Sequence, residues 1–364
     1  FKNNSPKAAA IRDMQLIWGP NIHLLPQEFE KSHDSFNRYQ KIDYPSSDGK
    51  LKAHNINLKA KENKLIILPE IPSWLVIKDL HFMSSFIFTD RSKIKNAFFR
   101  ENTGGFSYIG TSINDILLEP GATETVKLSS YIGPQEYKRL KKFNMQSIVD
   151  LGWIRILGIG MFYAMDFLYG LTKNYGIAIL LLTLFVRLLL WYPSQKSYKQ
   201  MKETQSKMKL MQPRLETLKK IYKDDPAKLN EETMKLYREY NVNPLGGCLP
   251  MLLQIPIFIA LYQTLISMVE LKGAYFFGWL KDLSRPDPLF ILPVFMGVSM
   301  IIQQMMSKPV SMTPEAETQQ KIMMWGMPIF LTFMALKWPA GLLLYWSMSN
   351  VLAIIQQTFV NKSK

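Results

Sequence analysis

The chain has 364 residues, with 44 Lys and Arg against 29 Asp and Glu and a formal net charge of +15. This length is sufficient for two or three domains, or for one domain joined to a membrane bundle. The basic balance favours anionic partners, and the long apolar runs of the second half favour a membrane over nucleic acid. The single cysteine, Cys248, excludes an intrachain disulfide.

Residues 1–150 have the composition of an ordinary soluble domain. Segments rich in β-branched and aromatic residues lie between turn residues, at 64–69, 73–90, 97–100 and 116–133. The alternation within "TETVKLSSYIG" and the Pro-Gly pair at 120–121 are typical of antiparallel strands. We therefore predict a β-sandwich-like domain over 1–150. The four histidines have spacings unlike those of metal motifs, so we expect no metal site.

The next segment, "WIRILGIGMFYAMDFLYGL" at 153–171, is apolar but carries Arg155 and Asp166. By composition it is either a helix that spans the membrane or an amphipathic helix that lies in the interface.

Five apolar runs have about the 20 residues that a spanning helix needs, and they lie at 174–192, 244–268, 288–306, 322–338 and 340–360. Between the first two, residues 193–243 are rich in Lys and Arg and carry apolar residues at helical spacing. We predict a helical hairpin here, with Asp225 as the N-cap of the second arm before Pro226. The positive-inside rule places this hairpin in the cytoplasm. Residues 1–150 then lie outside if 153–171 lies flat, and in the cytoplasm if it spans.

A charged residue stands within the first apolar run, "LLLTLFVRLLLWYP". Placing Arg187 in mid-membrane costs about 2.5–3.5 kcal/mol on insertion scales, which indicates a compensating role. One such role is that of an anchor that reaches the interface near Trp191. However, other runs also carry polar side chains, and no Asp or Glu lies within any of the five. The alternative is a positively charged groove for an acidic visitor, and its candidate residues are Arg187, Thr183, Gln254, Ser299, Gln303, Gln304, Ser347 and Asn350.

Sequence motifs of catalysis are absent. The chain holds no G-x-x-x-x-G-K-[ST], H-E-x-x-H or G-x-S-x-G, and no His or paired carboxylate within the apolar runs. We therefore predict a protein that is not an enzyme and needs no cofactor. The alternatives to a groove for acidic protein segments are a channel or transporter for a small anion, and a ribosome-binding membrane scaffold in which Arg187 is only an anchor.

The segment "NVNPLGGCLPMLLQIPIFIALYQTL" at 241–265 closely resembles the signature of the YidC family of membrane protein insertases, relatives of the mitochondrial Oxa and chloroplast Alb insertases. Further matches, in the family's order, are "NYGIAILLLTLFVRLLLWYP" at 174–193, "DLSRPDPLFILPVFMGVSM" at 282–300 and "PAGLLLYWSMSNVLAIIQQ" at 339–357. The resemblance implies the Gram-negative type, in the inner membrane, with an anchor helix before Phe1. It assigns 1–150 to a periplasmic β-sandwich-like domain, 151–173 to an interfacial amphipathic helix, 174–360 to a five-helix core with the hairpin 193–243 inserted, and 361–364 to a cytoplasmic tail.

The resemblance also implies how the core works. Arg187 corresponds to the family's groove arginine, and Gln254, Gln304 and Asn350 fall at groove-lining positions. A hydrophobic slide, along which an apolar segment leaves the groove, would involve Leu184, Leu188, Tyr345 and Trp346. The implied partners are nascent membrane proteins, the translating ribosome, membrane lipids and the Sec translocon. A monomer is expected to suffice, without cofactor or metal.

Overall fold

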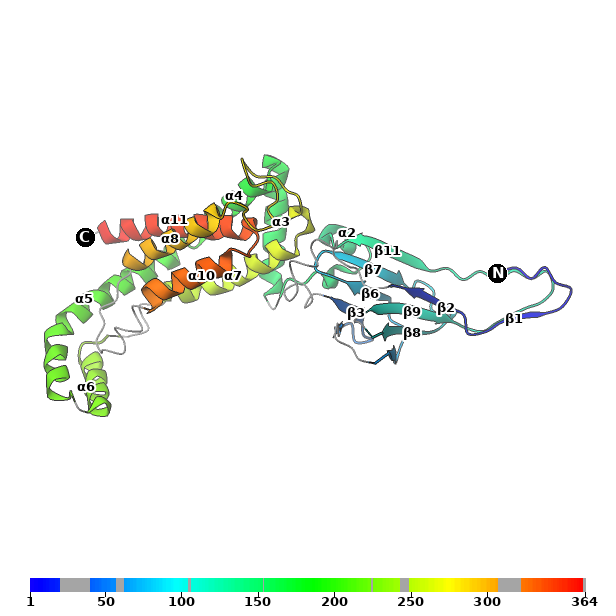
Figure 1. Ribbon diagram of the computed structural model, residues 1–364, viewed down its shortest axis with the longest axis horizontal. Coiled ribbons are helices and arrows are strands. Elements are labelled where there is room, and N and C mark those ends of the chain that lie inside the picture. Colours follow the sequence, from blue (N-terminus) through cyan, green and yellow to red (C-terminus); the bar gives the residue numbers. More distant parts are fainter. Residues whose placement is uncertain are drawn as a thin grey trace. The chain divides into compact units, whose positions relative to one another are not determined.

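The computed structural model describes residues 1–19, 40–56, 62–103, 106–152, 154–223, 225–242, 249–306 and 322–362. It divides into two compact units, Phe1–Asp150 and Leu151–Lys364. The first unit is built of strands and the second of helices (Figure 1).

The first unit contains a five-stranded and a four-stranded antiparallel sheet. The five-stranded sheet has the order β11-β7-β6-β3-β4, the four-stranded sheet has the order β2-β9-β8-β5, and β1 pairs with β10 apart from both. The strands are β1 (Ala9–Ile11), β2 (Gln15–Trp18), β3 (Lys41–Pro45), β4 (Leu51–Asn55), β5 (Lys64–Ile67), β6 (Trp74–Lys78), β7 (Phe82–Ile87), β8 (Ile94–Glu101), β9 (Ser107–Ile113), β10 (Ile116–Leu118) and β11 (Ser129–Pro134).

Both sheets contribute side chains to one hydrophobic core. Ile42, Leu75 and Ile77 come from the five-stranded sheet, and Phe99 and Ile109 come from the four-stranded sheet. Two sheets that share one apolar layer form a β-sandwich. The segment 73–90, expected as one strand-like stretch, contains two strands, because a turn at Asp79 separates β6 from β7. There the carboxylate of Asp79 accepts hydrogen bonds from the backbone N–H groups of His81 and Phe82.

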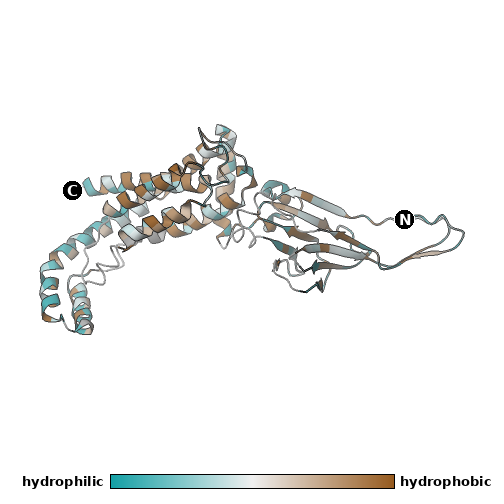
Figure 2. Ribbon diagram, in the orientation of Figure 1, coloured by the Kyte–Doolittle hydropathy of each residue, from teal (hydrophilic) through white to brown (hydrophobic). Residues whose placement is uncertain are grey.

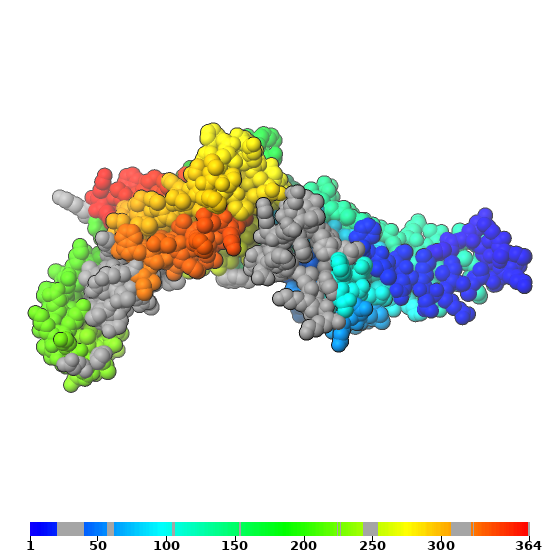
Figure 3. Space-filling model, viewed as in Figure 1, coloured from blue at the N-terminus to red at the C-terminus, as the bar shows by residue number. Residues whose placement is uncertain are grey.

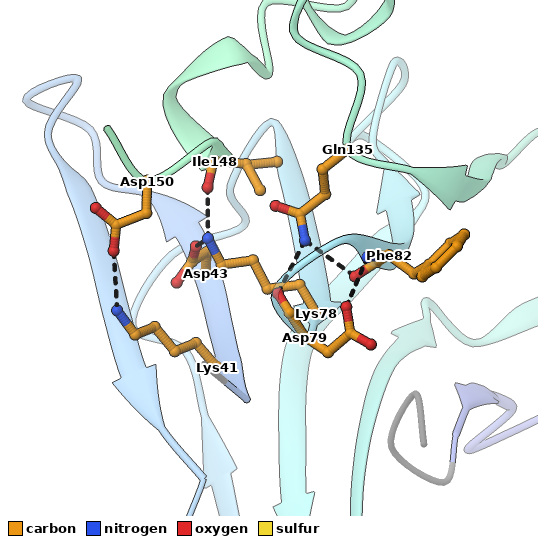
Figure 4. A network of polar contacts seen from close by, with 8 residues as sticks. All are labelled: Lys41, Asp43, Lys78, Asp79, Phe82, Gln135, Ile148 and Asp150. Carbon is orange, nitrogen blue, oxygen red and sulfur yellow. Dashed lines mark hydrogen bonds and ion pairs between the residues drawn. The ribbon is translucent and has the colours of Figure 1, made fainter. Parts of the chain in front are cut away.

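A buried ion pair ties the end of this unit to its sheet (Figure 4). Lys78 Nζ on β6 lies 2.9 Å from Asp43 Oδ2 on β3, and both side chains are almost fully buried. The same ammonium donates to the backbone carbonyl of Ile148, which lies in a short 3-10 helix, Gln146–Ile148. Nearby, Lys41 pairs with Asp150 at 3.4 Å. These contacts fix residues 146–150 on the sandwich.

The second unit is helical. Its helices are α3 (Arg155–Thr172), α4 (Tyr175–Leu189), α5 (Trp191–Ile221), α6 (Pro226–Glu239), α7 (Leu249–Ser267), α8 (Ile291–Met306), α10 (Met327–Ala335) and α11 (Ala340–Lys362). A short α2 (Tyr137–Lys141) belongs to the first unit. In Figure 2, α7, α8 and α10 are mainly hydrophobic, whereas α5 and α6 are mainly hydrophilic.

Close helix contacts hold the apolar helices together. α11 packs against α4 and α8, and α3 packs against α4 and α7. At Gly297 on α8, an added Cβ would lie only 2.0 Å from Thr332 Oγ1 on α10, so only glycine allows this approach. α8, α10 and the loop between α7 and α8 form much of the surface of the second unit in the view of Figure 3.

The predicted helical hairpin is present in α5 and α6. Its arms pack through Met211, Leu215 and Leu236, together with neighbouring apolar residues. Asp225 caps α6 by accepting a hydrogen bond from the Lys228 N–H at 3.0 Å, and Pro226 stands at the start of the helix. The N-cap predicted from the sequence is confirmed.

In the described ranges, no single helix has both the length and the hydropathy of a membrane span. The bent pair Tyr175–Leu189 and Trp191–Ile221, with an angle of 63° between its parts, meets both criteria together. The five spans therefore stay a prediction.

Candidate functional site

Arg187 lies in the last turn of α4, next to a break in the helix. α4 begins at an N-cap, Asn174, whose side chain accepts hydrogen bonds from the N–H groups of Gly176 and Ile177. It ends at Leu189, and α5 leaves at 63°. Pro193 has no N–H to donate to the carbonyl of Leu189, so the α4 hydrogen-bond ladder cannot continue. The break therefore places the arginine where α4 meets the hairpin.

The guanidinium of Arg187 is held by one residue of α11. Nε donates to Ser349 Oγ at 3.2 Å, and Nη2 donates to the same oxygen at 2.6 Å and to the Ser349 carbonyl at 2.9 Å. Ser349 is 3 % exposed, and Arg187 is half-buried. Among the described residues, no carboxylate pairs with Arg187. The positive charge is thus bound by neutral acceptors, as expected from the absence of acids in the apolar runs.

The polar contacts continue from Ser349 to α7. Tyr345 stands one helical turn before Ser349, and its hydroxyl lies within hydrogen-bonding reach of the Ser349 side chain. Gln254 Nε2 on α7 donates to the Tyr345 hydroxyl at 2.9 Å. Gln254 therefore joins the Arg187 cluster through Tyr345.

On the hairpin side, the cluster includes Tyr198 of α5. Burial raises the pKa of the Tyr198 hydroxyl, and the charge of Arg187 with hydrogen bonds from Gln303 and Arg187 opposes that effect. Gln303, on α8, is thus the amide of this helix that reaches the cluster. Five helices, α4, α5, α7, α8 and α11, supply side chains around one guanidinium.

Three other predicted groove residues, Asn350, Ser299 and Thr183, form hydrogen bonds that do not involve Arg187. Asn350 Nδ2 donates to Ser299 Oγ at 2.9 Å, joining α11 to α8. Thr183 Oγ1 donates to the Ile179 carbonyl of its own helix at 2.7 Å and is buried. The Ser347 hydroxyl is buried and has no hydrogen-bond partner in the described part of the chain. Gln304 is half-buried on α8.

The predicted slide residues fall into two environments. Leu184 and Leu188 of α4 are exposed, at 36 % and 59 %. Tyr345 is only 2 % exposed and takes part in the polar cluster. Trp346 is half-buried, with its ring stacked on Trp338 at 5.5 Å. The two leucines therefore share an accessible apolar face that Tyr345 does not join.

Sequence reasoning missed Ser349 and Tyr198, which both interact with the arginine. Ser349 stands between Ser347 and Asn350, and spacing alone does not show which of these three polar residues faces α4. Tyr198 lies within the stretch for which we predict a hairpin, and there a tyrosine is expected to pack between the two arms. The spacing of four residues puts Ser349 and Tyr345 on one face of α11, but it does not show that this face meets α4.

Profiles of known families match both units. The profile described as "60Kd inner membrane protein" matches residues 167–364, and the profile described as "YidC periplasmic domain" matches residues 20–164. The first match covers more than half of the chain, which therefore belongs to the 60Kd inner membrane protein family. The resemblance predicted from the sequence is confirmed.

Curated relatives carry the name "Membrane protein insertase YidC". The relative from Syntrophus aciditrophicus is 43% identical over 249 residues, which is 68% of this chain and 44% of the relative. That from Aromatoleum aromaticum is 39% identical over 287 residues (78% and 50%), and that from Pelobacter propionicus is 37% identical over 332 residues (88% and 59%). The chain thus spans about half the length of the curated relatives it matches.

A solved structure, described as an active YidC insertase with the first transmembrane domain resolved, has a TM-score of 0.46 and 23% sequence identity to this chain. The match covers 88% of this chain and 83% of the solved chain.

Proposed function

We propose that this chain carries the core of a membrane protein insertase and is not an enzyme. It moves the hydrophilic segment of a nascent membrane protein through a positively charged groove that opens to the cytoplasm, and then releases the apolar segment into lipid. Family membership and the names of the relatives support this activity. The observation that carries the groove is Arg187, a partly buried guanidinium held by Ser349, with no carboxylate beside it among the described residues.

The distribution of apolar surface supports the membrane arrangement. On α4 and α10, large apolar side chains such as Phe185 and Phe333 are exposed, and lipid tails would cover them. On α3, Ile156, Phe167 and Leu171 form an exposed apolar stripe, which suits a helix lying in the interface. We place the unit Phe1–Asp150 in the periplasm, and the hairpin 193–243 and the tail 361–364 in the cytoplasm. The five apolar runs cross the inner membrane.

The proposed mechanism depends on charge first and on apolar burial second. A carboxylate of an acidic segment replaces the neutral acceptors that bind Arg187, because a hydrogen bond between two charged groups is stronger than one to a neutral acceptor. Gln254, Gln303, Gln304 and Asn350 offer further hydrogen bonds. The apolar segment then enters lipid beside Leu184 and Leu188, driven by removal of its surface from water. The partners are nascent membrane proteins, the translating ribosome at the hairpin, membrane lipids and the Sec translocon, and a monomer without cofactor suffices.

The test is insertion of a single-span reporter with an acidic N-terminal tail, in cells depleted of their own insertase. The chain and its Arg187→Ala variant are compared at equal membrane levels, with Arg238→Ala in the hairpin as a matched control. We expect Arg187→Ala to lose insertion of the acidic reporter and to regain it when the acids of the tail are replaced by amides. Arg238→Ala should insert both reporters normally.

Unchanged insertion by Arg187→Ala would reject the groove and make the arginine an interfacial anchor of a ribosome-binding scaffold. Anion conductance through the purified chain in lipid bilayers, abolished by Arg187→Ala, would instead support an anion channel.

A further inference from the structure

The first turns of α5 contact both Arg187 and the end of α11. Tyr198 is 4 % exposed, and its hydroxyl lies beside the Arg187 guanidinium. The same residue packs with Met201 of α5 and Val360 of α11 in a small buried apolar cluster. One side chain of the hairpin therefore interacts with Arg187 and packs on the helix that holds this arginine.

Two further contacts fasten the base of α5 to α11. Gln356 Nε2 donates to the Trp191 carbonyl at 2.9 Å, at the first residue of α5. Lys202 Nζ donates to the carbonyls of Val360 and Asn361, both at 3.2 Å. These carbonyls belong to the last turn of α11, where backbone acceptors lack intrahelical donors and the helix dipole favours a cation. The attachment thus combines a small apolar cluster with polar contacts at the end of α11.

The guanidinium is held in a way that can be reversed. Three hydrogen bonds go from it to the hydroxyl and carbonyl of Ser349, and Tyr198 also interacts with it. All these groups are neutral, so a carboxylate forms shorter and stronger hydrogen bonds with Arg187 than they do. A carboxylate that binds the guanidinium has to approach it next to Tyr198, which is itself held on α11 through Val360.

We propose that Tyr198 is a positioning residue that couples the hairpin to the groove: while α5 packs on α11 it keeps Arg187 on Ser349, and withdrawal of α5 frees the guanidinium for an acidic segment. This inference rests on the proposed function, which supplies the acidic segment.

The coupling is measured as a distance in the full chain, purified into lipid nanodiscs. Spin labels are attached at Lys209→Cys on α5 and Asn361→Cys on α11, in a Cys248→Ser background, and the distance distribution is recorded by pulsed electron paramagnetic resonance. Tyr198→Phe keeps the ring that packs with Met201 but removes the hydroxyl. The matched control, Tyr237→Phe, removes a hydroxyl from the packing between α5 and α6.

We expect Tyr198→Phe and Arg187→Ala each to broaden the distribution and move it to longer distances, and the double variant to add nothing further. Tyr237→Phe should match the wild type. A synthetic peptide with an acidic tail and one apolar segment should broaden the wild-type distribution, whereas the same peptide with a neutral tail should not.

An unchanged distribution in Tyr198→Phe would overturn the coupling, and so would additive effects in the double variant or equal broadening by Tyr237→Phe. The reporter assay tests the proposed function separately. Suppose that Arg187→Ala inserts the acidic reporter normally while Tyr198→Phe still broadens the distance distribution. The proposed groove is then rejected, and the proposed coupling between hairpin and Arg187 is retained.

Discussion

Arg187 on α4 and Ser349 on α11 stand 162 residues apart in the sequence and are joined by three hydrogen bonds, of 3.2, 2.6 and 2.9 Å. Two of these bonds end on the serine hydroxyl and one on its carbonyl. The guanidinium uses its planar arrangement of donors, which an ammonium group does not have. Charge and geometry at this position can therefore be separated by substitution.

Arg187→Lys should keep the charge but lose the paired hydrogen bonds to Ser349. We expect insertion of the acidic reporter to fall between the levels of wild type and Arg187→Ala, because the ammonium still attracts carboxylates but is poorly positioned. Protease protection of the reporter tail measures this. If Arg187→Lys inserts the reporter no better than Arg187→Ala, the planar arrangement of donors in the guanidinium, and not the charge, determines activity.

Two serines of α11 should respond differently to truncation. Ser349→Ala removes two hydrogen bonds from Arg187, which lowers stability by about 0.6 kcal/mol if it behaves as an average contact between membrane helices, and by up to about 3 kcal/mol if it behaves as a hydrogen bond to a charged group. Ser347→Ala removes a buried hydroxyl that has no partner among the described residues, so stability should stay the same or rise. Thermal unfolding in detergent compares them, and a larger loss in Ser347→Ala would contradict the assignment.

The buried pair in the first unit gives a prediction about stability. Lys78→Met leaves Asp43 charged and buried, which should cost about 3–5 kcal/mol. The double variant Lys78→Met with Asp43→Leu removes both charges and should recover most of that loss. Hydrogen exchange of the β3 and β6 amides in the full chain measures the difference. Equal destabilisation by the single and double variants would show that the contact with Ile148, and not the unpaired charge, dominates.

The cap at Asp225 should stabilise the second arm of the hairpin. Asp225→Ala removes the acceptor for the Lys228 N–H and should cost about 1 kcal/mol, seen as faster hydrogen exchange in the first turn of α6. Asp225→Asn should exchange at nearly the wild-type rate, because asparagine caps equally well. Faster exchange in both variants would assign the effect to the charge of Asp225 near the helix N-terminus.

The helices could be predicted from the sequence because each apolar run carries its own signal. The run at 340–360 corresponds to α11, Ala340–Lys362, and the turn chemistry of Asp225 and Pro226 located the start of α6. The short strands were harder to predict from the sequence. β4, with the sequence LKAHN, has little apolar alternation and is recognised only through its pairing with β3.

The polar cluster could be predicted only in part, because it depends on how each helix is rotated about its axis. Arg187, Gln254 and Gln303 reach the cluster, whereas Thr183 bonds to its own helix and Asn350 bonds to Ser299. Spacing identifies residues on one face of a helix but does not show which neighbour that face meets. For this reason Tyr345, expected on the slide, lies with the polar residues instead.

The separation of Arg187 from Ser349 also has a consequence for biogenesis. At about 5–20 residues per second, a ribosome needs roughly 8–32 s to proceed from one residue to the other. Throughout that interval α4 exists with its charge while the serine that binds it has not yet been made. The guanidinium must then be hydrated, or bound by lipid phosphate or by another protein, and the synthesis of α11 ends this temporary arrangement.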